Sequence, residues 1–214
     1  MEFSLFKLPI KVRNSFFFLI GFLALMWGNG PDGANLMISV LCFITLFTAI
    51  LTHELGHALF ARWYGMQPRI EIHGMGGVTI WQSMKRLDFR QRFVISFAGP
   101  GTGLVLAGLF FGLLQIPNLP ALVHALLTMH LTVYIFLNLM NLLPIRPLDG
   151  AEVLSTLIGW KKGSVNEKII DKVSFVTAAG CAAYAYISGF MILAVMAGYL
   201  AWRSYNAANP NARR

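Results

Sequence analysis

Long apolar stretches separated by short polar ones dominate the pattern along this chain. Apolar runs occupy residues 16–28, 36–60, 93–115 and 119–143, and a final apolar block covers residues 173–202. A helix needs about 20 predominantly apolar residues to cross the hydrocarbon core of a bilayer. The pattern therefore predicts an all-α polytopic membrane protein with about six transmembrane helices, and a single membrane-embedded domain over residues 1–214.

The polar segment between the second and third apolar runs is expected to form β-structure rather than helix. Residues 69–73 and 78–81 are rich in β-branched and aromatic side chains, and a turn containing Gly74, Gly76 and Gly77 separates them. Two such stretches around a glycine-rich turn are typical of a β-hairpin. We therefore expect a small hairpin between spans two and three.

Two other breaks in the apolar pattern affect the expected helices. Glycines and Pro100 interrupt the third span at residues 99–103, and we expect them to loosen or kink the helix there. Ser188 and Gly189 divide the final block, which is either one oversized helix or two short spans. Two spans become long enough if the first of them begins near Lys168, whose side chain can extend toward the interface.

The distribution of basic residues favours two spans in the final block and sets the orientation. None of the 17 Lys and Arg residues lies at 28–35, 116–120 or 188–189, and all of them fall in the other four polar segments. Basic residues accumulate in cytoplasmic loops. Six spans with both termini in the cytoplasm satisfy this rule, whereas one final span would place three arginines outside.

Composition excludes several classes of protein. Hydrophobic residues make up 57% of the chain and charged residues 12%, against roughly 25% charged in soluble domains. A soluble globular protein is therefore excluded. The net charge of +8 is spread between apolar segments rather than gathered in a patch, so we expect no nucleic-acid partner. We expect the bilayer to surround the protein, and the composition does not indicate an oligomeric state.

The second span contains the pentad His53-Glu54-Leu55-Gly56-His57. Helical spacing of four residues places both imidazoles on one face, where they can share a metal ion, and Glu54 can reach a water molecule beside it. An ionisable cluster within a lipid-spanning helix is costly and is functional by default. The pentad therefore predicts a catalytic zinc site facing the protein interior.

A third ligand must come from elsewhere, because catalytic zinc usually takes three protein ligands. By the predicted topology Asp149 lies at the cytoplasmic end of span four, on the side to which both histidines are closest. A turn framed by prolines fixes its position, which makes it the preferred candidate. Glu71, Asp88 and Glu152 remain geometrically possible.

Three motifs in order along the chain carry a resemblance to a known family. They are HELGH at residues 53–57, AGP at 98–100 and NLLPIRPLDG at 141–150. Together they resemble the site-2 protease family of intramembrane zinc metalloproteases. The resemblance covers core spans 36–150 and leaves residues 16–28 and 168–203 as peripheral spans that could form a gate. Arg146 stands where family members often have an apolar residue or proline.

The resemblance implies a site and a reaction. It implies that His53, His57 and Asp149 bind one zinc ion per chain, that Glu54 is the general base, and that Asn141 helps to orient the scissile peptide. It gives the hairpin, with Gly74, Gly76 and Gly77, the role of holding substrate in extended form. The expected reaction is hydrolysis of peptide bonds in or near transmembrane segments of membrane-tethered regulators, or of signal-peptide remnants.

The same resemblance implies a multi-pass membrane protein that acts in regulated intramembrane proteolysis, and we expect it in the cell (inner) membrane. The predicted topology places both termini and the opening of the active site on the cytoplasmic side. We expect a minimal core without a PDZ or CBS module. Two alternatives are an inactive homologue that binds transmembrane partners, and a metal transporter that uses the same His and Asp residues. A transporter would need polar residues along the full depth of several spans.

Overall fold

The computed structural model describes residues 1–214 except residues 20–33, 75, 83–86, 164 and 210–214. The chain divides into two compact units, which are described separately: unit 1 holds residues 1–86 and 98–138, and unit 2 holds residues 87–97 and 139–214. Most of the first predicted span, residues 16–28, lies outside the described residues.

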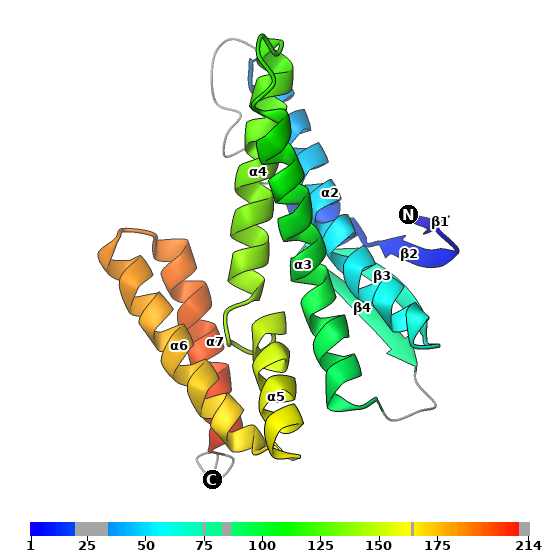
Figure 1. Cartoon of the computed structure of the whole chain (residues 1–214). Helices are drawn as coiled ribbons and strands as arrows, with labels where there is room; N and C mark the ends of the chain where they lie inside the picture. The colour runs from blue at the N-terminus through cyan, green and yellow to red at the C-terminus, as the bar shows by residue number, and fades with distance from the viewer. Residues whose placement is uncertain (20–33, 75, 83–86, 164, 210–214) are drawn as a thin grey trace. The chain divides into compact units, whose positions relative to one another are not determined.

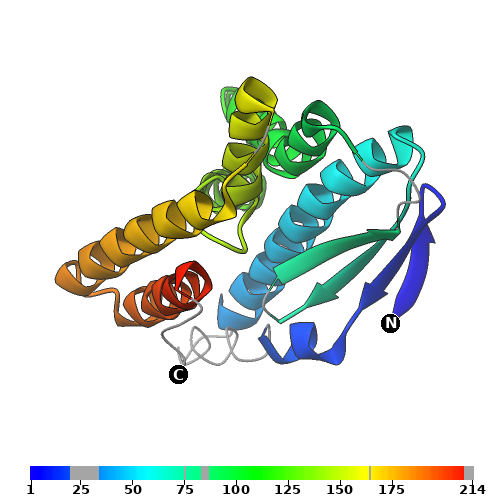
Figure 2. The same cartoon turned by 90° about the horizontal axis from the view of Figure 1, so that it is seen from below.

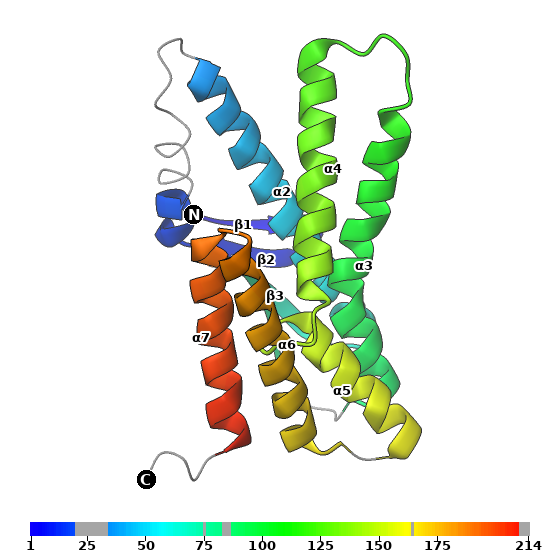
Figure 3. The ribbon, with the colours of Figure 1, turned by 90° about the vertical axis from the view of Figure 1, so that its left-hand side faces the viewer.

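Three long helices confirm the second, third and fourth predicted spans as apolar helices. They are α2 (Ala34–Trp63), α3 (Phe89–Leu113) and α4 (Ala121–Asn141), and α3 lies beside α4 (Figures 1 and 3). Among the described residues, these three are the helices long and apolar enough to cross a membrane. Large apolar side chains such as Val105, Phe111 and Phe136 are more than half exposed, as lipid-facing side chains are.

The predicted hairpin is present as part of a larger sheet. Strands β3 (Gln67–His73) and β4 (Gly76–Gln82) pair antiparallel, with His73 opposite Gly76. The N-terminal residues form β1 (Glu2–Leu5) and β2 (Leu8–Val12), and β2 runs parallel to β3, so the strand order is β1-β2-β3-β4. These two strands were not predicted. Helix α2 covers one face of the sheet (Figure 2).

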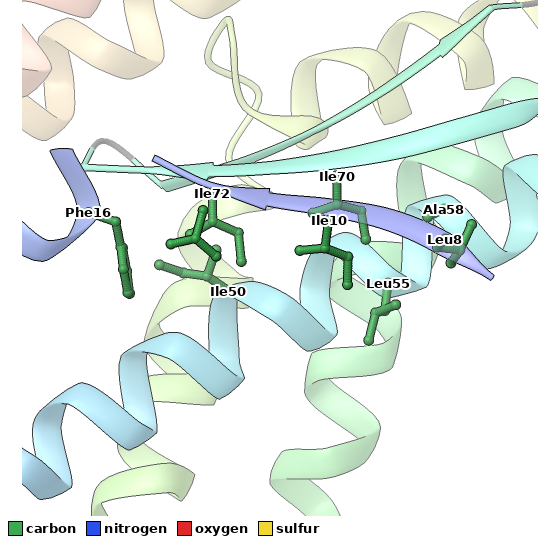
Figure 4. Close-up of a cluster of buried hydrophobic side chains, with 9 residues drawn as sticks. Leu8, Ile10, Phe16, Ile50, Leu55, Ala58, Ile70 and Ile72 are labelled. Carbon is green, nitrogen blue, oxygen red and sulfur yellow. The ribbon is translucent and has the colours of Figure 1, made fainter. Parts of the chain in front are cut away.

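An apolar layer joins the sheet to α2. Alternate residues of β2 and β3 point toward α2 (Figure 4). There they contact Ile50, Leu55 and Ala58, which lie on successive turns of the helix. This cluster consists of Leu8, Ile10, Val12, Phe16, Ile50, Leu55, Ala58, Ile70 and Ile72. Because Leu55 is the middle residue of the pentad, this packing holds the pentad against the sheet.

Unit 2 contains three further helices: α5 (Asp149–Lys162), α6 (Glu167–Ile187) and α7 (Met191–Ala208). Helix α5 was not predicted. Helices α6 and α7 lie side by side (Figure 3), joined at Ser188 and Gly189, where Gly189 takes a positive φ of 80°. The final apolar block is therefore two helices. Whether they span a membrane stays a prediction, as does the count of about six spans.

Candidate metal centre

The pentad lies within α2, and its three polar side chains are buried in an apolar helix. His53 and Glu54 are each 5% exposed and His57 is 6% exposed. The helix places the two imidazole rings on one face, as predicted from their spacing of four residues. Buried ionisable groups in an apolar helix require partners, because unpaired ones would strongly destabilise the fold.

The geometry of the two histidines fits one tetrahedral zinc ion. Their Nε2 atoms lie 3.2 Å apart. Two nitrogens bonded at about 2.0–2.1 Å to one tetrahedral zinc ion are about 3.3 Å apart. Two imidazole nitrogens this close need a proton or a cation between them, since their lone pairs otherwise repel. The pair therefore has the spacing and the chemistry of two zinc ligands.

An amide from α4 reaches the other side of the His53 ring. Asn138 Oδ1 lies 2.8 Å from His53 Nδ1, and Asn138 Nδ2 donates to the backbone carbonyl of Tyr134 at 2.7 Å. Asn138 is fully buried. Metal-binding histidines commonly donate their second ring nitrogen to such an oxygen.

Two glycines of α3 leave the space that these side chains occupy. A Cβ atom at Gly99 would lie 2.2 Å from His57 Nε2, and one at Gly103 would lie 2.0 Å from Asn138 Nδ2. Real Cβ contacts are not shorter than 3.0 Å, so neither position accepts a side chain in this arrangement. Helix α3 continues through Pro100, and its glycines make room for side chains of the centre.

Glu54 contacts the edge strand β4. Thr79 Oγ1 donates to Glu54 Oε2 at 2.6 Å. A Cβ atom at Gly77 would lie 2.4 Å from Glu54 Cγ, so only glycine fits between this strand and the carboxylate. Of the other two hairpin glycines, Gly76 takes a positive φ of 123° in the turn, and Gly74 lies against the backbone of Ser15.

Asp149 is the third potential ligand. Among the described residues, His53 and His57 of unit 1 and Asp149 of unit 2 could together hold a metal ion. Asp149 is the first residue of α5, after a compact loop in which Leu148 N donates to the Ile145 carbonyl at 2.7 Å. A Cβ atom at Gly150 would lie 2.1 Å from the Leu142 carbonyl oxygen, so glycine is needed next to Asp149.

The other acidic residues that the sequence left open have different partners. Glu71 accepts hydrogen bonds from Arg13 Nε at 2.9 Å and Nη2 at 2.5 Å, and the Arg13 guanidinium holds the pKa of this carboxyl below its usual value. Glu152 pairs with Arg92 at 2.5 Å. Asp88 Oδ1 accepts a hydrogen bond from the Gln91 backbone N–H at 2.7 Å. Asp149 therefore stays the predicted third ligand.

Known proteins match this chain over a region that includes the pentad. Residues 41–122, which include the pentad, match the model of peptidase family M50. The chain is 31% identical over 179 residues to sll0528 of Synechocystis, a candidate zinc metalloprotease. It is 30% identical over 168 residues to zinc metalloprotease MJ0392 of Methanocaldococcus jannaschii. The resemblance to the site-2 protease family is confirmed.

The matches have defined limits of coverage. They include 78% and 75% of this chain, and the chain spans just under half of those relatives, 46% of each. Among solved structures, the site-2 protease from Methanocaldococcus jannaschii matches with a TM-score of 0.60 and 22% identity, over 97% of this chain and 94% of that one. This likeness shows that the two chains share a fold.

The site-2 protease resemblance gave Asn141 the role of orienting the scissile peptide, and the described contacts leave that role a prediction. Asn141 is the last residue of α4 and is partly exposed. Sequence reasoning missed Asn138 and Thr79, which contact His53 and Glu54. An asparagine inside a run as apolar as α4 was an available signal for Asn138, because a buried amide in a membrane helix needs a partner. Nothing local distinguishes Thr79 from the other strand residues.

Arg146, the departure from the usual family pattern, has specific partners within unit 2. Its backbone N–H donates to Ser174 Oγ at 2.7 Å, and its guanidinium pairs with Glu167 and with Asp171, the latter at 3.1 Å. Ser174 also shares a hydrogen bond with Ser204 at 2.8 Å. These contacts tie the loop before Asp149 to α6.

Proposed function

We propose that this chain is the core of an intramembrane zinc endopeptidase of the site-2 protease type. The supporting observation is the buried pair of imidazoles, with Nε2 atoms 3.2 Å apart, next to Glu54 within an apolar 27-residue span. The family match and the names of the relatives agree with this chemistry. His53, His57 and Asp149 would hold the metal. Zinc bound by them would supply Lewis acidity at this point of the helix.

Glu54 is the proposed general base. Its Oε2 accepts from Thr79, which fixes the orientation of the carboxylate and leaves Oε1 as a proton acceptor. Glu54 takes a proton from the water whose oxygen attacks the peptide carbonyl carbon. It then returns this proton to the amide nitrogen as the C–N bond breaks. This transfer regenerates the Glu54 carboxylate and leaves a carboxylic acid and an amine as products.

The proposed substrate is a transmembrane segment that has unwound locally. Backbone hydrogen bonds of a helix hide the scissile peptide, so an extended segment is required. Among the described residues β4 is an edge strand, and its face toward α2 carries Gly77 and Thr79 beside Glu54. A substrate segment could add to this edge through backbone hydrogen bonds. Membrane-tethered regulators and signal-peptide remnants are the proposed substrate classes, as in regulated intramembrane proteolysis.

The proposed location is the cell (inner) membrane, with both termini and the opening of the site in the cytoplasm. The two histidines lie in the C-terminal half of α2, which ends near Arg62. Six basic residues lie between residues 62 and 92. By the positive-inside rule this end of α2 faces the cytoplasm. Water would then reach the centre from that side.

Two measurements on detergent-purified protein test the proposal. Elemental analysis should find about one zinc ion per chain, and His53→Ala and Asp149→Ala should lose it, whereas His124→Ala, altered at an exposed position, should retain it. In proteoliposomes, Glu54→Gln should keep zinc and lose cleavage of transmembrane peptides by at least about 100-fold. Glu2→Gln, which alters an exposed glutamate paired with Lys11, is the matched control.

The outcomes separate the proposal from its alternatives. Wild-type protein that binds zinc and transmembrane peptides without cutting any of them would indicate an inactive binding homologue. Zinc flux across proteoliposomes would indicate a transporter. The polar side chains of α2 that precede the pentad do not favour the transporter, because they pair with side chains of α4. Thr45 and Thr48 contact His130 at 3.1 and 3.3 Å, and Thr52 donates to the Tyr134 hydroxyl at 3.1 Å. Absence of zinc from the wild type would refute the proposed function.

A further inference from the structure

We propose that Asn138 is a positioning residue that holds the His53 ring with its Nε2 lone pair available to the metal. This inference rests on the proposed zinc site and adds a residue to it. Asn138 itself does not touch the metal position, and its effect is transmitted through the imidazole. The supporting observations all lie within unit 1: a hydrogen bond, the burial of the amide, and the space that Gly103 leaves for it.

The hydrogen bonds of Asn138 determine which ring nitrogen of His53 carries the proton. The Tyr134 carbonyl can only accept, so the amide atom 2.7 Å from it is the NH₂ group. The carbonyl oxygen of the amide therefore faces His53 Nδ1 at 2.8 Å. Since Oδ1 can only accept, Nδ1 must be the protonated nitrogen. In a neutral imidazole this leaves the lone pair on Nε2, the atom that faces His57.

The surroundings prevent the amide from turning away. Asn138 is completely buried, and a Cβ atom at Gly103 would lie 2.0 Å from its Nδ2 and 2.3 Å from its Cγ. The amide plane is thus confined between the backbone of α3 and the His53 ring. In an apolar span a buried amide without partners is strongly destabilising, so both of its hydrogen bonds are retained. This rigidity fixes the direction of the ring as well as its protonated nitrogen.

Zinc affinity of detergent-purified protein, measured by competition with a chromophoric chelator, tests the inference. Asn138→Leu removes the acceptor while keeping the branched shape of the side chain, and should raise the zinc dissociation constant by about 10–100-fold. Asn138→Asp restores an acceptor for Nδ1 and should recover most of the loss. The matched control is Tyr134→Phe, which removes a hydrogen bond from Thr52 in the same buried interface but keeps the Tyr134 carbonyl. Its zinc affinity should equal that of the wild type.

A second readout does not depend on metal binding. In metal-free protein with ¹⁵N-labelled histidine, the wild type should show His53 protonated at Nδ1, and Asn138→Ala should show a mixture of the two neutral forms. Asn138→Ala also serves if Asn138→Leu fails to fold, since the smaller side chain fits the same space. Unfolding temperatures of the metal-free variants identify those that are folded.

The results separate this inference from the proposed function. Weaker zinc binding in Asn138→Leu or Asn138→Ala, recovery in Asn138→Asp and no change in Tyr134→Phe would support the positioning role. Wild-type zinc affinity in folded Asn138→Leu or Asn138→Ala would overturn it while leaving the zinc site intact. Equal weakening in Tyr134→Phe would also overturn it, because the effect would then come from general loosening of the interface. Absence of zinc from the wild type would refute the proposed function itself.

Discussion

Substitution of Gly99 by alanine tests the space around His57 directly. The added Cβ would lie 2.2 Å from His57 Nε2 and 2.6 Å from Cε1, whereas ordinary contact begins at 3.4 Å. The imidazole must therefore retreat by about 1.2 Å, which is several times the tolerance of about 0.2 Å in metal–ligand distances. His57 would no longer reach an ion held by His53.

The expected result of Gly99→Ala is a rise of at least about 100-fold in the zinc dissociation constant, more than the loss of an outer hydrogen bond causes. Alanine has the higher helix propensity, so α3 should remain helical. Chelator competition on detergent-purified protein measures the affinity. Gly108→Ala is the matched control, because a Cβ at Gly108 of the same helix meets nothing within 4 Å. Wild-type zinc affinity in folded Gly99→Ala would refute the steric argument.

Two further substitutions test other parts of the centre and the sheet. Gly77→Ala places a Cβ 2.4 Å from Glu54 Cγ and should lower peptide cleavage at least about 10-fold with zinc content unchanged; loss of zinc would contradict the assignment of Gly77 to the base. Glu71→Gln should lower the denaturation midpoint at pH 7, because the Arg13 bond depresses the pKa of Glu71 in the folded state. The stabilisation that this pair gives the wild type is present above the ordinary carboxyl pKa of 4.5. It is lost as the pH falls through the depressed pKa of Glu71. A difference in denaturation midpoint between Glu71→Gln and the wild type that stays the same at low pH would contradict this reasoning.

The parts of the structure that were predicted depend on signals within short stretches of sequence. The spacing of His53 and His57 is a property of one helix, and the β3–β4 hairpin depends on one glycine-rich turn. Strands β1 and β2 gave no such signal, because β2 pairs in parallel with a strand more than fifty residues later in the chain. Such a pairing is decided by tertiary packing on α2, which a local pattern does not reveal.

Helix α5 was missed although its termini carried a usable signal. Its first turn holds Asp149 and Glu152, and its last turn holds Lys161 and Lys162. Acidic residues near the N-terminus and basic residues near the C-terminus of a helix complement its dipole. We considered the two acidic residues as candidate metal ligands and the two lysines as indicators of membrane topology. The structure shows that they also mark the two ends of a helix that begins at the proposed third zinc ligand.

The glycines of α2 and α3 show why one sequence pattern can serve two physical purposes. Small residues in membrane helices usually allow close packing of backbones, and Gly56 does this, since a Cβ there would meet the Ala98 carbonyl oxygen at 2.5 Å. Gly99 and Gly103 instead face an imidazole and an amide. Their spacing of four residues matches that of His53 and His57 on the facing helix, so successive turns of α3 leave space at successive levels of the centre. The expectation that residues 99–103 loosen the helix treated these glycines as backbone features alone. Their contacts indicate that α3 needs glycine here because the atoms of the metal centre already occupy the positions of the missing side chains.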